Sequence, residues 1–207
     1  MILFCTMFTG IIECTGKIDE ISNNGSNRSF HISSPISNQL KADQSVSHNG
    51  VCLTIEKMDE NSHVVTAIDE TLTKTNLSKY DVGNIVNLER CLQINGRIDG
   101  HIIQGHIDCT AICTTIMDKN GSYNYRFHFP GKFASLIIEK GSIAVNGISL
   151  TLFDISKDEF TVSIIPYTLA HTNFQFLKVN DEVNIEFDMM GKYIQRNLHL
   201  FGGKNIP

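Results

Sequence analysis

The chain carries one sequence pattern twice, about a hundred residues apart. Ser45–Thr54 (SVSHNGVCLT) returns as Ser142–Thr151 (SIAVNGISLT), and Glu70–Leu77 (ETLTKTNL) returns as Tyr167–Phe174 (YTLAHTNF). The offset is 97 residues in both cases (142 − 45 and 167 − 70). Over Phe30–Glu89 more than a quarter of the positions are identical at this offset, whereas about six per cent would match by chance. So long a period indicates a duplicated domain, because solenoid repeats are much shorter.

The repeat divides the chain into parts. The opening of each copy recurs as well, since Gly10–Thr15 (GIIECT) resembles Gly105–Thr110 (GHIDCT) at an offset of 95 residues (105 − 10). We therefore expect an N-terminal extension, a first domain, a second domain and a C-terminal tail, at residues 1–6, 7–97, 98–190 and 191–207.

Each copy has the pattern of a small β domain. Short runs rich in Val, Ile, Leu, Thr and Phe alternate with Asn-Gly, Gly-Ser and Asn-Asp turn signals, without a long helical periodicity. We expect an all-β fold of two small barrels or sandwiches with about six strands each. In the tail, Ile194, Leu198 and Phe201 follow the i, i+4, i+7 spacing of one helical face. That face packs either on its own domain or on the same helix of a partner subunit.

Composition excludes several classes of function. The 207 residues carry a net charge of −5, so the chain lacks the basic surface that nucleic acids or anionic membranes select. No apolar run approaches the ~20 residues that span a bilayer. Six cysteines are scattered through a chain too long to need disulfides, and the N-terminus has no basic region or cleavage site of a signal peptide. We expect a reduced, cytoplasmic protein without nucleic-acid or membrane partners.

One cluster of possible metal ligands comprises His101, His106, Cys109 and Cys113. The segment from residue 100 to 113 alternates enough to predict an extended chain, in which neighbouring side chains point to opposite faces. His101, Cys109 and Cys113 would then share one face, and His106 the other. Two cysteines four residues apart on a strand would stand roughly 13 Å apart, too far to bind one ion. We therefore expect no metal site.

The repeated Asn-Gly turn enters a strand in both copies. Alternation places Cys52 and Thr54 on one face in the first copy, and Ser149 and Thr151 on one face in the second, with apolar residues opposite. The apolar row suits a barrel interior, so the polar pairs face outward, toward solvent, a neighbour or a ligand. The same pattern is also typical of an ordinary hairpin, and both interpretations stay open.

Some repeated positions differ between the copies. His106 stands opposite Ile11, Cys52 opposite Ser149, and Glu70 opposite Tyr167. A single histidine on a strand is commonly a structural residue, but asymmetry at an otherwise repeated position favours a functional one. A duplicated protein with asymmetric pockets suggests two copies of one ligand held in different roles.

The chain resembles the riboflavin synthase family, of the trimeric α-chain type, over essentially its whole length from Met7. The matching segments are long and in the right order: Met7–Glu13 (MFTGIIE), Asn49–Thr54 (NGVCLT), Asn87–Arg90 (NLER), Gly100–Asp108 (GHIIQGHID), Lys140–Thr151 (KGSIAVNGISLT) and Asn184–Asp188 (NIEFD). In the second copy, Tyr167 stands where many relatives carry histidine.

The resemblance implies two tandem six-stranded Greek-key β-barrels and a short C-terminal helix that gathers a homotrimer. It implies that two molecules of 6,7-dimethyl-8-ribityllumazine dismutate by transfer of a four-carbon unit, without a metal or organic cofactor. Riboflavin and a ribitylaminouracil result. The site would lie between the first barrel of one subunit and the second barrel of its neighbour. Lumazine synthase is a further candidate partner.

The resemblance also implies which residues form the site. His106 would assist proton transfer, while Cys52, Ser149 and Thr151 would orient the substrate or a nucleophilic water. Asp188 would anchor a ribityl hydroxyl or assist a proton relay. The remaining expected substrate contacts are Gly10, Ile11, Ile12, Ser45, Leu53, Thr54, Thr66, Ala67, Ile68, Asp69, Glu70, Thr71, Gly105, Ile107, Lys140, Leu150, Ile165, Pro166, Tyr167, Thr168, Leu169 and Ala170.

Two other functions remain compatible with the sequence. A non-catalytic antenna-type relative would share both barrels and bind lumazine or flavin without turnover. A purely structural duplicated β-protein would assemble through its C-terminal helix and bind neither. The presence of His106, Lys140, Ser149 and Thr151 together in the second half favours the enzyme.

Overall fold

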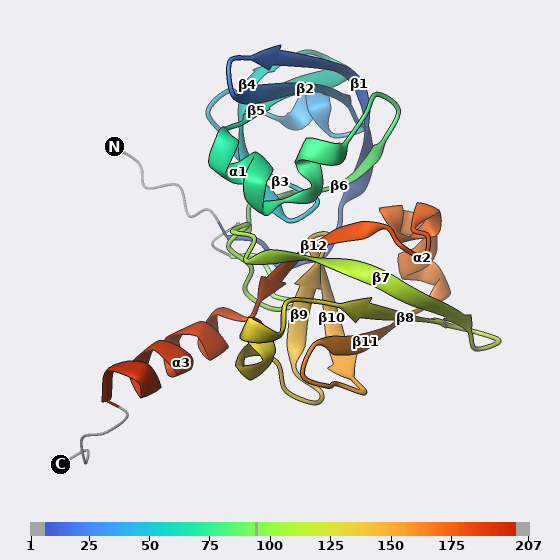
Figure 1. Cartoon of the computed structure of the whole chain (residues 1–207). Coiled ribbons are helices and arrows are strands. Elements are labelled where there is room, and N and C mark those ends of the chain that lie inside the picture. The colour runs from blue at the N-terminus through green and yellow to red at the C-terminus, as the bar shows by residue number, and fades with distance from the viewer. Residues whose placement is uncertain (1–6, 94, 202–207) are drawn as a thin grey trace.

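The computed structural model describes residues 7–93 and 95–201, apart from the side chain of Phe201. The expected N-terminal extension at residues 1–6 lies outside the described residues. Two closed antiparallel barrels of six strands each lie one above the other, and a single longer helix extends to one side of the second barrel (Figure 1). The predicted all-β duplicated fold is confirmed.

The first barrel closes in the order β1-β2-β5-β4-β3-β6. A short helical stretch follows β2, and two more connect β5 to β6. The elements are β1 (Cys14–Asn24), β2 (Asn27–Ser33), η1 (Ser37–Gln39), β3 (Ser45–His48), β4 (Val51–Met58), β5 (Ser62–Ala67), α1 (Asp69–Lys74), η2 (Asn76–Lys79) and β6 (Ile85–Arg90).

The second barrel repeats this order element by element, as β7-β8-β11-β10-β9-β12. Even an irregularity of register recurs, between Ile18 and Glu20 in β1 and between Cys113 and Thr115 in β7. The elements are β7 (Cys109–Asp118), β8 (Tyr123–His128), η3 (Gly131–Leu136), β9 (Ser142–Val145), β10 (Ile148–Phe153), β11 (Glu159–Ile164), α2 (Pro166–His171), η4 (Asn173–Phe176), β12 (Glu182–Phe187) and the C-terminal helix α3 (Met189–Phe201).

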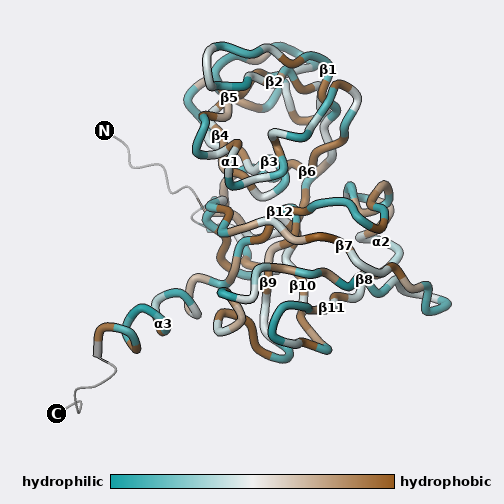
Figure 2. Tube along the Cα trace, viewed as in Figure 1, coloured by the Kyte–Doolittle hydropathy of each residue, from teal (hydrophilic) through white to brown (hydrophobic). Residues whose placement is uncertain are grey.

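Each barrel has its own apolar core, to which the strands contribute alternate residues. Hydrophobic and hydrophilic residues therefore alternate along the trace of both barrels (Figure 2). The second core is rich in phenylalanine, and the rings of Phe127 and Phe160 lie 5.4 Å apart. As predicted, Val51, Leu53 and Ile55 of β4 face the first core. The polar residues between them are left on the outer face.

The first core contains a buried polar chain. The ring nitrogens His48 Nε2 and His63 Nε2 lie 2.9 Å apart, and His48 Nδ1 lies 3.0 Å from the carbonyl of Val46. At the other end, Ser37 Oγ lies 3.0 Å from His63 Nδ1. Burial lowers the pKa of His48 to about 3 and that of His63 to about 4, so both rings are neutral at pH 7.

Asparagines join the two barrels in a pattern that repeats with the halves exchanged. Asn87 Nδ2 donates to the carbonyl of Asn146, and the equivalent Asn184 Nδ2 donates to the carbonyl of Asn49, both at 3.0 Å. The two Asn-Gly turns meet here, because a Cβ on Gly50 would lie 2.8 Å from the backbone of the matching turn. Buried amides that satisfy buried carbonyls fix how one barrel sits on the other.

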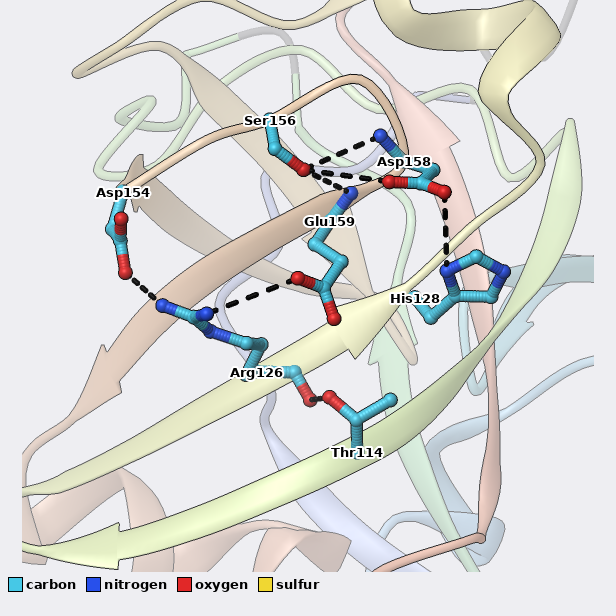
Figure 3. A network of polar contacts seen from close by, with 7 residues as sticks. All are labelled: Thr114, Arg126, His128, Asp154, Ser156, Asp158 and Glu159. Carbon is cyan, nitrogen blue, oxygen red and sulfur yellow. Dashed lines mark hydrogen bonds and ion pairs between the residues drawn. The ribbon is translucent and has the colours of Figure 1, made fainter.

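An outer edge of the second barrel is held by charged side chains (Figure 3). Arg126 of β8 forms an ion pair with Asp154, just after β10, and its Nη1 lies 3.8 Å from Glu159 Oε2 of β11. His128 Nδ1 lies 3.8 Å from Asp158 Oδ2 at the same edge. These contacts tie the β10–β11 connection to the neighbouring strand.

Helix α3 leaves the second barrel directly after β12 (Figure 1). Asp188 precedes it, and its Oδ1 accepts a hydrogen bond from the amide of Met190 at 2.9 Å, which is an N-cap contact. Lys192 Nζ lies 2.5 Å from Asp108 Oδ2 and ties the first turn to the barrel. Ile194 and Leu198 of the predicted apolar face are exposed, whereas the side chain of Phe201 lies outside the described residues. No helix among the described residues is long and apolar enough to cross a membrane.

We predict that the histidine pair makes the first barrel sensitive to acid. Both folded-state pKa values lie below the ordinary 6.5, so the unfolded chain takes up protons first and stability falls as the pH drops below about 6.5. At about pH 5.5 the loss should reach about 2 kcal/mol for the pair. Urea unfolding between about pH 7 and pH 5 measures it.

The second barrel supplies the control variant, since Val145 and Phe160 occupy the positions equivalent to His48 and His63. The double variant His48→Val/His63→Phe should lose most of the acid-dependent decrease in unfolding free energy. An equal decrease in the variant and the natural protein would contradict this assignment.

Candidate functional site

A pocket of about 210 Å³ lies against the first barrel, and we call it the first site. Cys52 projects from β4 at one wall, and α1 forms the rim. The opposite wall is formed by the segment before β7, which belongs to the second half of the chain and lies across β4. Its lining residues are Val51, Cys52, Glu70, Thr71, Lys74, Thr75, Gly105, His106 and Ile107.

A backbone hydrogen bond holds this crossing segment in place. The amide of Cys52 donates to the carbonyl of Gly105 at 2.9 Å, and Ile107 packs against the first core although it precedes the second barrel. Gly105 has φ +81°, and a Cβ there would lie 2.5 Å from the Cβ of Cys52. Only glycine allows so close an approach in this conformation.

The second barrel has an equivalent arrangement, and we call it the second site. The amide of Ser149 in β10 donates to the carbonyl of Gly10 at 2.9 Å, and Gly10 has φ +77°. Ile12, which precedes the first barrel, packs against the second core. The segment that leads into each barrel therefore covers a strand of the other barrel, and we call residues 10–12 and 105–107 the two entry segments.

The two sites differ at the residue that the covering segment carries. The first site has His106, whose side chain is exposed, whereas the second has Ile11, an apolar side chain that is 48% exposed. Burial raises the pKa of the Cys52 thiol, and the nearby Glu186 carboxylate adds to the rise. Cys52 is therefore a neutral thiol at pH 7, able to donate a hydrogen bond but not to act as a ready nucleophile.

Ser149 has an imidazole as its side-chain partner. His101 Nδ1 lies 2.7 Å from Ser149 Oγ, and the backbone of His101 is fixed by its amide, which donates to the carbonyl of Thr9 at 3.1 Å. Burial lowers the pKa of His101, and the carboxylate of Asp188 partly opposes that shift. A neutral imidazole beside a hydroxyl can accept or return a proton.

The rim helices also differ. In α1, Lys74 Nζ lies 2.7 Å from Glu70 Oε1, an exposed ion pair. The equivalent residues of α2 are Tyr167 and His171, whose rings stack with centroids 4.1 Å apart. The first site therefore has a charged rim and the second an aromatic one.

The structure brings several of the expected residues into these two groups, with each entry segment over a strand of the other barrel. Gly10, Ile11 and Ile12 lie with the second-barrel strand, and Gly105, His106 and Ile107 lie with the first. Thr54 and Thr151 share the outer faces with Cys52 and Ser149. The side chains of Leu53 and Ala67 belong to the first core, so only their backbone can face a ligand.

The other expected residues surround the same two strands. Ser45 pairs with Thr54 across β3 and β4, and its hydroxyl lies within hydrogen-bonding reach of the Cys52 thiol. Lys140 places its Nζ 5.6 Å from the ring centroid of Phe153, which shares the outer face of β10 with Thr151. Thr66 is occupied by a contact between its Oγ1 and Ser29 Oγ at 2.7 Å.

One local expectation was wrong. The segment from residue 100 to 108 is not a strand; apart from a bridge between Phe8 and Ile103 it is irregular, and β7 begins only at Cys109. Its glycines and the hydrogen bonds to the first half of the chain override the alternating pattern. Among the described residues no group of three or more His, Cys, Asp or Glu side chains could hold a metal ion.

Three residues of the arrangement were missed. The sequence marks His101 only as a candidate metal ligand, because its contact with Ser149 depends on the irregular path of the segment from residue 100 to 108. Glu89 and Glu186 are buried carboxylates that bind the backbone of the two entry segments. Their signal was present in the sequence, since both copies end in Val-Asn-x-Glu, at Val86–Glu89 and Val183–Glu186.

Comparisons with known proteins agree with the duplication. A family model described as the lumazine binding domain matches residues 9–91 and again 104–188. The riboflavin synthase of Actinobacillus pleuropneumoniae is 40% identical over 193 residues, which cover 93% of this chain and 90% of that protein. The riboflavin synthase of Bacillus amyloliquefaciens is 39% identical over 194 residues, with the same coverage of both chains.

Solved structures give the same fold. The crystal structure of LumP complexed with 6,7-dimethyl-8-(1'-D-ribityl) lumazine superposes with a TM-score of 0.79 at 25% identity, covering 87% of this chain and 98% of that one. LumP complexed with riboflavin superposes with a TM-score of 0.81 at 24% identity and the same coverage.

We predict that Gly105→Ala destabilises the protein by more than the cost of placing an alanine at positive φ. The added Cβ collides with Cys52, so the variant should lose about 2–4 kcal/mol of unfolding free energy. Gly83→Ala is the matched control, because Gly83 also has positive φ (+93°) but nothing lies within 4 Å of an added Cβ. Chemical denaturation measures both; equal losses would show that the close approach at Gly105 contributes nothing.

Proposed function

The chain belongs to the riboflavin synthase family, and we propose that it converts two molecules of 6,7-dimethyl-8-ribityllumazine into riboflavin and 5-amino-6-ribitylaminouracil. One molecule donates a four-carbon unit and the other accepts it. Atoms and electrons balance between the two substrates and the two products, so the net reaction consumes no oxidant or reductant. The observation that carries the proposal is the pair of equivalent sites built around Cys52 and Ser149.

Two equivalent sites suit a reaction between two identical molecules. In each site a glycine segment lies close against a strand of the other barrel, so a ligand on the outer face of that strand would contact both halves of the chain. Holding both heterocycles in a fixed pose removes much of the entropic barrier before any bond forms. Differences between the sites, His106 against Ile11 and Cys52 against Ser149, allow one substrate to donate and the other to accept.

The proton transfers are assigned to residues at the site walls. His106 assists removal of a proton from the 7-methyl group of one lumazine, which is unusually acidic for carbon, so a modest base suffices. Cys52, as a neutral thiol, and Thr151 orient the bound rings by hydrogen bonding. Ser149, held by His101, orients a nucleophilic water or the substrate. Asp188, next to His101, anchors a ribityl hydroxyl or assists the proton relay.

We also propose that the active unit is a homotrimer whose site forms between the first barrel of one subunit and the second barrel of its neighbour. Apolar side chains at the second site support this, since Ile11, Ile165 and Tyr167 are exposed in the single chain. Helix α3 likewise leaves large apolar residues uncovered: Met190, Tyr193, Ile194, Leu198 and Leu200. Exposed apolar patches of this kind mark contact surfaces. We place this activity in the cytoplasm.

The second candidate function is that of an antenna-type protein, which the likeness to LumP favours. Such a protein would bind lumazine or flavin and release no product. The identity of about 40% to riboflavin synthases, against 25% to LumP, supports the enzyme.

We predict a stoichiometry of two lumazines consumed for each riboflavin formed. The assay supplies the purified chain with ribityllumazine and follows the loss of substrate and the rise of yellow product. Binding of lumazine without release of riboflavin would favour the antenna-type function, and absence of both would favour a purely structural role.

The single variants His106→Ala and Ser149→Ala should each lower kcat by about tenfold or more, because each removes a group assigned to proton transfer or orientation. Val82→Ala, an exposed position outside both sites, is the control for handling and expression. Unchanged turnover in His106→Ala would remove this residue from the chemistry.

A further inference from the structure

Two buried carboxylates hold the segments that cover the sites. Glu186 lies on β12 and is 2% exposed. Its oxygens accept hydrogen bonds from the amides of Gln104 at 2.7 Å, Gly105 at 2.9 Å and His106 at 2.9 Å. One side chain thus fixes three successive backbone groups, including those of the residue assigned to proton transfer.

Glu89 does the same in the other half. It lies on β6 and is 4% exposed. Its oxygens accept from the amide of Thr9 at 2.6 Å, from the hydroxyl of Thr9 at 2.8 Å and from the amide of Gly10 at 3.0 Å. A carboxylate that accepts several N–H groups fixes a loop far more firmly than neutral acceptors do.

The arrangement is crossed. Glu186 belongs to the second barrel, but the segment it holds lies over Cys52 of the first barrel. Glu89 belongs to the first barrel, but the segment it holds lies over Ser149 of the second. We propose that Glu186 is a positioning residue for the first site and Glu89 for the second, so that each barrel controls the ligand site of the other.

The hydrogen-bonding capacity of a carboxylate explains why a neutral side chain is expected not to hold the entry segment in place. The hydrogen-bond partners of each carboxylate are backbone amides and, for Glu89, one hydroxyl, and all of them donate, so an ionised side chain satisfies them with both oxygens. In Glu→Gln the amide offers one oxygen and places an NH₂ donor against backbone donors. In Glu→Asp the charge remains, but the side chain is one methylene shorter and reaches fewer of them.

Hydrogen exchange tests the crossing without relying on activity. The amides of Cys52 and Ser149 are protected by the carbonyls of Gly105 and Gly10, so each reports whether its covering segment is in place. Glu186→Gln should accelerate exchange at Cys52 by about tenfold or more and leave Ser149 unchanged, because charge-assisted hydrogen bonds are lost. Glu89→Gln should do the reverse.

The core amides of Val65 and Val162, at equivalent positions of the two barrels, control for unfolding of a whole barrel. If a Gln variant does not fold, the Asp variant of the same residue replaces it, and the same crossed pattern is expected. Faster exchange confined to the barrel that carries the substitution would overturn the proposal, and so would equal acceleration at Cys52 and Ser149.

Turnover supplies a second readout, which rests on the proposed function. Glu186→Gln should lower kcat, and its effect should be non-additive with Cys52→Ala but additive with Ser149→Ala. If the natural protein forms no riboflavin, the proposed function fails, yet the exchange pattern still decides whether the crossed positioning is correct. Additive effects with both partners in an active enzyme would contradict the inference.

Discussion

Two backbone hydrogen bonds connect the halves of this protein at the places where its ligands are proposed to bind. The amide of Cys52 donates to Gly105 and the amide of Ser149 donates to Gly10. Each bond brings an entry segment across to the other barrel, and each requires a glycine with positive φ because a Cβ would collide with the strand beneath. The pocket at Cys52 is accordingly lined by residues from both halves of the chain. The buried asparagines between the barrels and the carboxylates Glu89 and Glu186 maintain this exchange.

Duplication provides a symmetric frame, and the proposed chemistry is assigned to the positions where the two halves differ. Strand order, the register irregularity and the Asn-Gly turns recur in both halves. The two halves differ at a few equivalent positions. His106 is equivalent to Ile11, and the Glu70–Lys74 ion pair of α1 is equivalent to the Tyr167–His171 ring stack of α2. A reaction between two identical molecules needs such a difference, since one must donate what the other accepts. Differences between the two cores have another expected effect, since the lowered pKa values of His48 and His63 predict a loss of stability in acid.

Local periodicity was sufficient to predict the strands and the outward-facing pairs at Cys52 and Ser149, and the repeat at an offset of 97 residues was sufficient to predict the duplication. It was insufficient for the segment from residue 100 to 108, where the alternation predicted a strand that in the structure begins only at Cys109. Long-range hydrogen bonds decide the path there, and no spacing rule encodes a contact between Gly10 and Ser149. The family resemblance implied a list of site residues, and that list stays a prediction. Which barrel each entry segment covers follows only from the long-range hydrogen bonds of the structure. The sequence shows that Glu89 and Glu186 recur at equivalent positions. It does not show their role, because that role depends on which backbone amides they bind.

The most direct test of the account is a crystal structure of the chain with riboflavin bound. The account predicts a ligand that contacts Cys52 together with Gly105–Ile107, and a second that contacts Ser149 together with Gly10–Ile12. A ligand that contacts Cys52 together with Gly10–Ile12 of the same chain would contradict the exchange of entry segments on which the two sites depend.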